Sequence, residues 1–485
     1  MELTNKRKET RQWRDWEVKR ACETARELER AGDYEGARAA LGKLWIRIGE
    51  RPAVDELPPD TRAEALLRVG ALSGWLGSAN QIQGAQEFAR DLLTESVTLF
   101  ESLDQQDKRA QAMTDLALCY WRSGAQDDSR ALFQQALETA QTAETKVRTL
   151  TNASTVEVSS GRYKDALTLL DNASAFLAKV SDDWIHGRYH GQRGLVYRGL
   201  DGTENLDRAL IEYSAASMHF ANAGHVRYLA RVENNIGFIL LRLGRTTEAL
   251  THLDKAREIF VSLKDSRMVA QVNETRARVF LAQKRFAEAE RAILNAIRVL
   301  EQGDDASLLA EALTTQGSIF AGGGKYDSAR KAFQRASDVS AAAGDSHLAA
   351  IAQLRMIEEM GSMLSREELL TSHRSADQYI GDRASQLDLE RLRHCERIVM
   401  DSIENLDRVE DELIGGTLGQ EVNHFEARLI EQALEEENGS ITRAARKLGL
   451  TRQGLLNILD GRQSKILEGL RPPKRVRHKS SSRKK

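Results

Sequence analysis

Apolar residues recur every three or four positions along most of the chain, which is the pattern of helices that bury one face. From about residue 20 to residue 360 these apolar stretches come in pairs, separated by short polar turns that often contain glycine. Proline, which would interrupt such helices, is absent between Asp60 and Arg471. Aromatic residues make up only 6% of the chain, which disfavours strands. The pattern predicts an all-α fold.

The paired helices repeat with a period of forty residues. Gly237, Ala277 and Gly317 lie forty positions apart, and each is followed twelve positions later by alanine. Small residues let two helices cross closely, and a large residue four positions further on, such as Leu253 or Phe333, fills the space beside the crossing. About eight such hairpins cover residues 20–345.

This pattern resembles the tetratricopeptide repeat family. The period exceeds that family's usual length of about thirty-four residues, and the proline that commonly ends the second helix is absent. Stacked hairpins leave a concave groove lined by their first helices, where a protein or peptide partner can bind. Four polar residues of the first helices are candidates for such contacts, although each one also suits a solvated face or a ladder between repeats: Asn234, Arg231, Arg188 and Asn273.

Residues 425–459 predict three short helices near the C-terminus. Gly439 stops the first helix, and the hydroxyls of Ser440 and Thr451 are suited to cap the second and third. Ala445 allows close approach, Gly449 makes a sharp turn and a buried leucine follows, which is the spacing of a helix-turn-helix. The apolar stripe predicted for the first helix consists of Phe425, Leu429, Ile430, Ala433 and Leu434.

The segment NGSITRAARKLGLTRQGL resembles the C-terminal DNA-binding domain of the Fis family. The resemblance implies that the last helix enters a major groove of double-stranded DNA and that the first helix pairs two domains into a homodimer. The basic residues usual in that family are missing at Leu456, Asn457 and Ile458, which predicts a weaker grip on phosphates there. The candidates for base contacts are Thr451, Arg452, Gln453 and Asn457, and those for phosphate contacts are Arg443, Arg446 and Lys447.

The charge of the chain is concentrated at one end. Its net charge of −2 divides into +8 for residues 471–485, which contain no acid, and −10 for the rest. A basic tail directly after a helix-turn-helix favours a nucleic-acid partner, and RNA remains an alternative to DNA for the tail. Its candidate contact residues are Arg471, Lys474, Arg475 and Arg477.

These features predict five segments. A helical lead-in occupies residues 1–19, the repeat solenoid residues 20–360, a helical connector residues 361–415, the helix-turn-helix domain residues 416–470, and a disordered basic tail residues 471–485. Within the connector, Ser365 and Glu368 have the spacing of a capping box that opens a helix, and a long amphipathic helix is expected from about Ala384 to Val409.

The sequence offers no convincing catalytic site, so neither an enzyme nor a cofactor is predicted. The run of glycines before Lys325 lacks the spacing of a phosphate-binding loop and suits a repeat turn. His186, His190 and Asp182 have a spacing that permits a shared metal, but such spacing is common on a polar helix face, so no metal is predicted. Three scattered cysteines and a charged N-terminus favour a cytoplasmic protein, and no apolar stretch reaches the length of a membrane span.

Together these patterns predict a cytoplasmic, nucleoid-associated transcription regulator of bacterial type. The helix-turn-helix would bind a specific DNA sequence, and the repeats would receive a protein, peptide or small signal. The alternative is a repeat scaffold for protein assembly whose C-terminal helices serve only in packing and never contact DNA.

Overall fold

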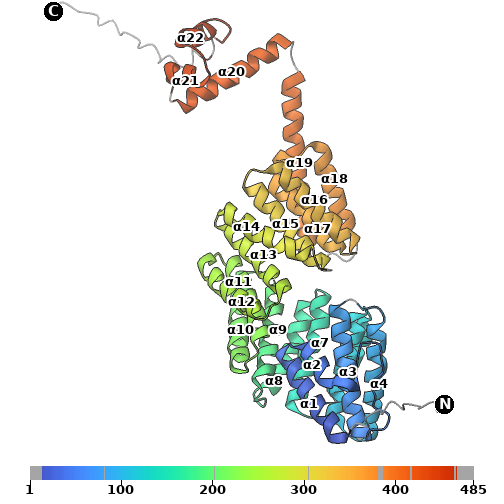
Figure 1. Ribbon diagram of the computed structural model, residues 1–485. Helices are drawn as coiled ribbons and strands as arrows, with labels where there is room; N and C mark the ends of the chain where they lie inside the picture. The colour runs from blue at the N-terminus through green and yellow to red at the C-terminus, as the bar shows by residue number, and fades with distance from the viewer. Residues whose placement is uncertain are drawn as a thin grey trace, which may run out of the picture. The chain divides into compact units, whose positions relative to one another are not determined.

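The structure is a computed structural model, and it describes residues 14–80, 82–200, 202–303, 305–380, 386–414, 418–437, 439–463 and 466 (Figure 1). All regular structure in these residues is helical, as the sequence predicted. Contacts divide the chain into two compact units. The first comprises residues 1–363 and 371–395, and the second comprises residues 364–370 and 396–485.

The first unit contains eight helical hairpins followed by a further helix, α17 (Ser346–Met360), among the described residues. The first helices of the hairpins are α1 (Asp15–Ala31), α3 (Pro59–Ala79), α5 (Gln106–Arg122), α7 (Ala143–Ser159), α9 (Asp183–Gly199), α11 (Val226–Arg242), α13 (Ser266–Ala282) and α15 (Ala306–Gly322). The second helices are α2 (Tyr34–Leu41), α4 (Ala85–Ser102), α6 (Gln126–Thr139), α8 (Tyr163–Leu177), α10 (Thr203–Asn222), α12 (Thr246–Ser262), α14 (Phe286–Leu300) and α16 (Tyr326–Ala342).

The forty-residue period has a direct structural cause. Helices α11, α13, α15 and α17 begin at residues 226, 266, 306 and 346, because the first helices of these hairpins are 17 residues long and each hairpin adds a second helix and two short turns. Small residues do mark the crossings, as predicted. A Cβ on Gly237 would lie 2.5 Å from Cγ of Leu253, and one on Gly317 would lie 2.6 Å from the ring of Phe333.

The turns after α11, α13 and α15 each contain a residue in the left-handed region. Gly244 and Gly324 have φ values of 75° and 74° in the turns that follow α11 and α15. The equivalent turn after α13 has Lys284, whose φ of 58° is uncommon for a residue with a Cβ. The glycine run before Lys325 is therefore the end of α15 and its turn, as predicted.

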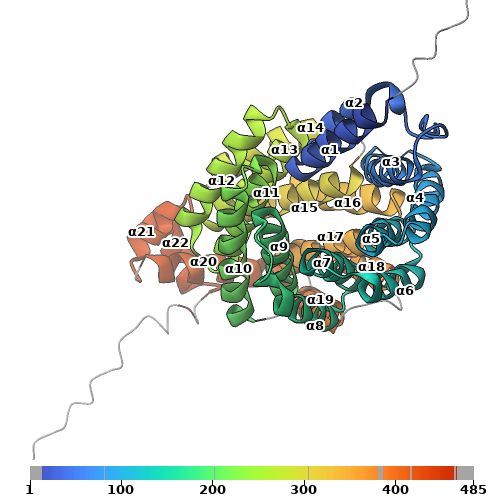
Figure 2. The same cartoon turned by 90° about the horizontal axis from the view of Figure 1, so that it is seen from below.

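The first helices form the inner layer of the solenoid. Along most of the array each first helix contacts the first helix of the next hairpin. Examples are the contacts of α3 with α5, of α5 with α7 and of α13 with α15. Figure 2 shows α4, α6, α8, α10 and α12 on the outside of these helices. Large residues fill the space between the layers, and Tyr213, Phe220 and Phe260 are almost wholly buried around α11. The array also turns back on itself, because α1 contacts α11.

The remaining helices are α18 (Arg366–Ile380), α19 (Gln386–Ile414), α20 (Leu418–Glu436), α21 (Ile441–Lys447) and α22 (Arg452–Asp460), and short 3₁₀ turns occupy Gly42–Leu44 and Gly361–Met363. The predicted capping box opens α18: Ser365 N–H donates to Glu368 Oε2 at 2.8 Å, and Glu368 N–H donates to Ser365 Oγ at 3.3 Å. The predicted amphipathic helix is α19. Within the described residues, every helix is too short or too polar to cross a membrane.

Candidate functional site

Helices α20, α21 and α22 form a compact trihelical core in the second unit. Ala445 is buried where α21 meets α22, and Leu455 fills the space between the helices with no exposed surface. Gly449 makes the turn with a φ of 68°, and Leu450 N–H donates to Ala445 O at 2.8 Å. Thr451 caps α22, because its Oγ1 accepts from Gly454 N–H at 3.0 Å. The predicted helix-turn-helix geometry is therefore present.

One local expectation was wrong. Ser440 precedes α21 in extended conformation, but its hydroxyl makes no cap; its backbone carbonyl instead accepts from Arg443 N–H and Ala444 N–H at 3.0 and 2.9 Å. The apolar stripe predicted for α20 is covered only in part. Ile430, Ala433 and Leu434 are buried, whereas Phe425 and Leu429 are 60% and 42% exposed. The three buried residues belong to one cluster with Ala444, Ala445, Leu455 and Leu459 of α21 and α22, and neither Phe425 nor Leu429 is part of it.

The first turns of α22 present polar side chains to solvent. Thr451, Arg452, Gln453 and Asn457 are all exposed, and Gln453 Nε2 donates to Asn457 Oδ1 at 3.1 Å. Arg452 makes no ion pair with any described residue. An exposed guanidinium at the start of a recognition helix can present two parallel donors to a base edge, which is what bidentate contact with guanine requires.

The basic residues of α21 divide into two groups. Arg443 is paired with Glu437, with Nε 3.2 Å from Oε2, and Lys447 is paired with Glu436. The hydrogen bond from Lys447 lowers the pKa of Glu436 below its usual range. Arg446 is exposed and has no acidic partner among the residues described. The tail candidates Arg471, Lys474, Arg475 and Arg477 lie outside the described residues.

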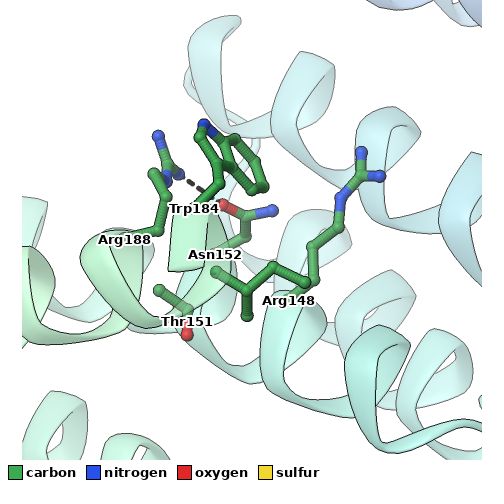
Figure 3. A pocket seen from close by; sticks show the side chains of 6 residues that line it. Arg148, Thr151, Asn152, Trp184 and Arg188 are labelled. Atoms are coloured by element: carbon green, nitrogen blue, oxygen red, sulfur yellow. Dashed lines mark hydrogen bonds between the residues drawn. The ribbon is translucent and has the colours of Figure 1, made fainter. Parts of the chain in front are cut away.

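A second candidate site lies on the inner layer of the solenoid, between α7 and α9 (Figure 3). It is a hollow of about 20 Å³, which has room for about one water molecule. Arg188 Nη2 donates to Asn152 Oδ1 at 2.9 Å beside the indole of Trp184. The lining residues are Arg148, Thr151, Asn152, Trp184, Ile185 and Arg188.

Several hydrogen-bonding groups near this hollow are unused. Thr151 and Trp184 line the hollow, and their Oγ1 and Nε1 atoms are buried and have no hydrogen-bond partner in the described part of the chain. The same holds for Oδ1 of Asn234 on α11, a residue that does not line the hollow. Buried polar atoms are usually paired, so these three atoms mark places where a ligand or a water can bind. Of the other predicted groove residues, Arg231 is exposed with its guanidinium 5.9 Å from the ring of Tyr228, and Asn273 is buried.

The N-terminal hairpin covers this part of the inner layer. Arg30 of α1 lies 3.2 Å from both Glu144 and Asp182 and 5.6 Å from the centre of the Trp184 ring. Tyr34 at the start of α2 is 3.0 Å from the hydroxyl of Tyr228 on α11. Burial raises the pKa of Tyr34 well above its usual range. The groove predicted from the repeats is therefore occupied at α7, α9 and α11 by the chain's own first hairpin.

Comparison with known families identifies both parts of the chain. The family model for the tetratricopeptide repeat matches residues 68–142, 228–302 and 268–342. The family model described as bacterial regulatory protein, Fis family, matches residues 422–457. This chain carries tetratricopeptide repeats and a Fis-family helix-turn-helix domain. Comparison with the curated proteins finds none that matches the chain.

Several solved structures share part of the helical arrangement of the tetratricopeptide array. A Rap protein complexed with competence and sporulation factor is 17% identical, with 72% of this chain and 99% of that chain covered and a TM-score of 0.48. Aspartyl phosphate phosphatase F from Bacillus subtilis is 12% identical, with coverage of 67% and 93% and a TM-score of 0.46. BtubC from P. vanneervenii is 18% identical, with coverage of 50% and 92% and a TM-score of 0.36.

The sequence did not predict two sets of contacts: the ion pairs of the basic residues of α21, and the contact of the N-terminal hairpin with α11. The acidic partners in the Fis-type domain are Glu436, the last residue of α20, and Glu437, which follows it, and the spacing of the basic residues alone does not reveal them. The aromatic pair Tyr34 and Tyr228 joins repeats that are 194 positions apart. The sequence offers no separate signal for this contact, because Tyr34 occupies the same repeat position as Tyr163 and Tyr326, each of which begins the second helix of its hairpin.

Proposed function

We propose that the protein is a sequence-specific, DNA-binding transcription regulator whose tetratricopeptide repeats receive a protein or peptide signal. The observation that carries the proposal is the start of α22, where Thr451 caps the helix, Leu455 anchors it and Arg452 stands exposed without an ion-pair partner among the described residues. A helix held in this way can enter a major groove with its N-terminal residues at the base edges. We further propose that the regulator acts in the cytoplasm, at the nucleoid.

Roles in DNA binding follow from the exposed groups. Arg452 is suited to read guanine through two hydrogen bonds, and Gln453 is suited to read adenine, for which it must release Asn457. Arg446 is positioned as the first phosphate contact, because Arg443 and Lys447 must first leave their carboxylate partners. Residues of the basic tail add attraction that does not depend on DNA sequence.

A homodimer is supported by the uncovered face of α20. Val422, Phe425 and Leu429 are spaced three and four positions apart, and they are 56%, 60% and 42% exposed. Three large apolar side chains in a row on one helix favour pairing with an identical helix about a two-fold axis. Two recognition helices related in this way would bind a two-fold DNA site.

The repeat groove is proposed to receive an extended peptide or a partner helix. Support comes from the unused polar atoms of Thr151 and Trp184, which line the hollow together with the guanidinium of Arg188, and from the unused Oδ1 of Asn234 on the next first helix along the chain. Because the present hollow is so small, binding requires the N-terminal hairpin to move from α9 and α11. Displacement of that hairpin is therefore the proposed response to the signal.

The DNA proposal is tested with the full-length protein, after a preferred site has been selected from random duplexes. We expect Arg452→Ala to lose about 1–3 kcal/mol on the preferred site and to relax its base preference, whereas Arg446→Ala weakens all duplexes alike. Equal losses of Arg452→Ala on preferred and random DNA would contradict base reading. Absence of duplex binding by the wild type would favour the scaffold alternative.

The contribution of the tail is measured in the same assay. Deletion of residues 471–485 is expected to weaken binding broadly and to flatten the dependence of affinity on salt concentration, because fewer counterions are released. An unchanged salt slope would refute this contribution. The intact chain could instead bind RNA more tightly than duplex DNA. If deletion of the tail removed that preference, the tail would be assigned to RNA.

The dimer is tested by sedimentation of the full-length protein. Phe425→Glu places a charge on the exposed face of α20 and is expected to give monomers with weakened binding to a two-fold site. Ile211→Glu is the matched control, because Ile211 is 69% exposed on α10 of the repeat array. Dimers that persist unchanged in Phe425→Glu would show that this face is not the interface.

A further inference from the structure

Three histidines from two helices lie together in the repeat array, apart from the DNA-binding domain. His186 and His190 are one turn apart on α9, and His219 lies in the last turn of α10. The ring centres are 4.8 Å apart for His186 and His219 and 5.5 Å apart for His190 and His219. One ring nitrogen from each histidine lies within 4.8 Å of those of the other two. Within the described residues, this is the group of side chains best placed to hold a metal ion.

Each of the three rings is held by an oxygen acceptor. Nδ1 of His190 lies 2.7 Å from Glu212 Oε2, Nδ1 of His219 lies 2.6 Å from Asp183 Oδ1, and Nε2 of His186 lies 2.8 Å from Val180 O. A carboxylate or carbonyl oxygen can only accept, so the bonded nitrogen carries the proton and the second nitrogen of a neutral ring keeps its lone pair. Histidines that bind metals are oriented by the same kind of contact.

The hydrogen bonds alone would not distinguish these histidines. His252 is bonded to Glu233 and His347 to Asp388, yet neither belongs to a group of potential ligands. His186, His190 and His219 differ from these two because their rings, each held by its own acceptor, also lie close to one another. The sequence spacing had placed Asp182 near His186 and His190. In the structure Asp182 instead caps α9 and pairs with Arg30.

We propose that His186, His190 and His219 bind one divalent transition-metal ion of the Zn²⁺ class. Imidazole ligands suit zinc, nickel, cobalt and copper, whereas magnesium and calcium prefer oxygen. The ion is bound by Nδ1 of His186 and by Nε2 of His190 and of His219, and a solvent molecule completes a four-coordinate site.

The geometry requires a small adjustment. Two nitrogens bound to one ion at about 2.1 Å can be at most about 4.2 Å apart. The three ring nitrogens lie within 4.8 Å of one another, so any pair that is farther apart than about 4.2 Å must approach each other. Rotation of one imidazole about its side-chain bonds supplies this movement without moving either helix. The neighbouring carboxylates of Glu212 and Asp183 offset the charge of the ion.

A metal ion at this site would affect the nearby hollow on the inner layer of the solenoid. His186 lies on α9 between Trp184 and Arg188, which line the hollow beneath the N-terminal hairpin. An ion shared by α9 and α10 would clamp the two helices of one hairpin and limit the movement of α9. Metal binding would then stabilise the repeat array and set the conformation of this part of its inner layer.

The test uses untagged full-length protein that has been freed of metal with a chelator and dialysed. Titration calorimetry with ZnCl₂ is expected to show one equivalent bound by the wild type, and MgCl₂ is expected to show none. His219→Ala should weaken zinc binding at least about 100-fold. Asp183→Asn, which keeps all three ligands, should weaken it about 10- to 100-fold. His347→Ala, a change at an exposed histidine outside the cluster, should leave zinc binding unchanged.

Circular dichroism separates a lost ligand from a lost fold. We expect zinc to raise the melting temperature of the wild type. The site is supported if metal-free His219→Ala has the same helix content and melting temperature as the metal-free wild type, and if zinc no longer raises its melting temperature. If His219→Ala is less helical, His190→Gln replaces it as the test of the ligand set. The proposal is overturned if the wild type binds no zinc, or if a folded ligand variant binds zinc as tightly as the wild type does.

Discussion

Glu233 offers the sharpest test of how the repeat array is held together. It lies on α11 with 1% of its surface exposed. Its carboxylate accepts from Ser217 Oγ of α10 at 2.7 Å, and from His252 Nδ1 and Lys255 Nζ of α12 at 2.6 and 2.7 Å. One buried carboxylate thus joins three consecutive helices. We predict that Glu233→Gln destabilises the array strongly at neutral pH and only weakly in acid.

The magnitude follows from the pKa of this carboxyl group. Burial alone would raise it, but hydrogen bonds from His252, Lys255 and Ser217 and the charge of Lys255 hold the pKa of Glu233 at about 2, against 4.5 for an unperturbed glutamate. Because the pKa is lower in the folded state, the stabilisation is complete above pH 4.5 and is lost as the pH falls towards 2. The difference corresponds to roughly 3 kcal/mol at neutral pH.

The assay compares urea unfolding of the wild type and of Glu233→Gln by circular dichroism at several pH values from 7 to 3. Taking the difference between the two proteins at each pH cancels the titration of the other carboxyl groups. Because a repeat array can unfold in parts, hydrogen exchange of α10, α11 and α12 should localise the loss. Glu248→Gln is the control, since Glu248 forms an exposed ion pair with Arg245 and should change stability little.

Two outcomes would refute this reasoning. If Glu233→Gln were as stable as the wild type at pH 7, the contacts of the buried carboxylate would contribute nothing net. If it were less stable by the same amount at pH 7 and pH 3, the loss would come from packing or amide geometry, and the charge of Glu233 would not be its cause. Either result would remove the electrostatic link between α10, α11 and α12.

Three further predictions test other parts of the structure. Lys284→Gly should raise stability by about 0.5–1 kcal/mol in thermal unfolding, because the turn residue has a φ of 58°. Leu455→Ala should cost about 2–5 kcal/mol, melt the trihelical core in circular dichroism and abolish DNA binding. Burial raises the pKa of Cys22, Cys119 and Cys395 to about 12, 11 and 12, so a thiol reagent at pH 8 should label them only after unfolding.

The repeats were predictable because their signal is local. The spacing of Gly237, Ala277 and Gly317 reflects how closely two helices of one hairpin approach, and that approach depends on residues less than twenty positions apart. The turn of the helix-turn-helix was predictable for the same reason, since Gly449 and Thr451 act on backbone groups within five residues.

The return of the N-terminal hairpin to α11 was not predictable from such patterns. It depends on the curvature of the array, which accumulates from small rotations between successive hairpins. The contact between Tyr34 and Tyr228 appears only after those rotations bring the first repeat to the sixth. The histidine group was predictable only in part. The spacing of His186 and His190 puts them on one helix face, whereas His219 reaches them only through the crossing of α9 and α10.

The ion pairs of the Fis-type domain affect where the proposed DNA specificity would reside. Arg443 and Lys447 are 58% and 49% exposed in their pairs with Glu437 and Glu436, and exposed pairs of this kind contribute at most about 1 kcal/mol each. Under the proposed function, a DNA phosphate would replace either carboxylate only after the pair has separated, so we expect these two residues to add less to affinity than their charge suggests. Arg452 has no such partner among the described residues to lose on meeting a base. If the proposed function is correct, we therefore expect sequence preference to be concentrated at the first turn of α22, and affinity to depend more on basic residues that lack carboxylate partners.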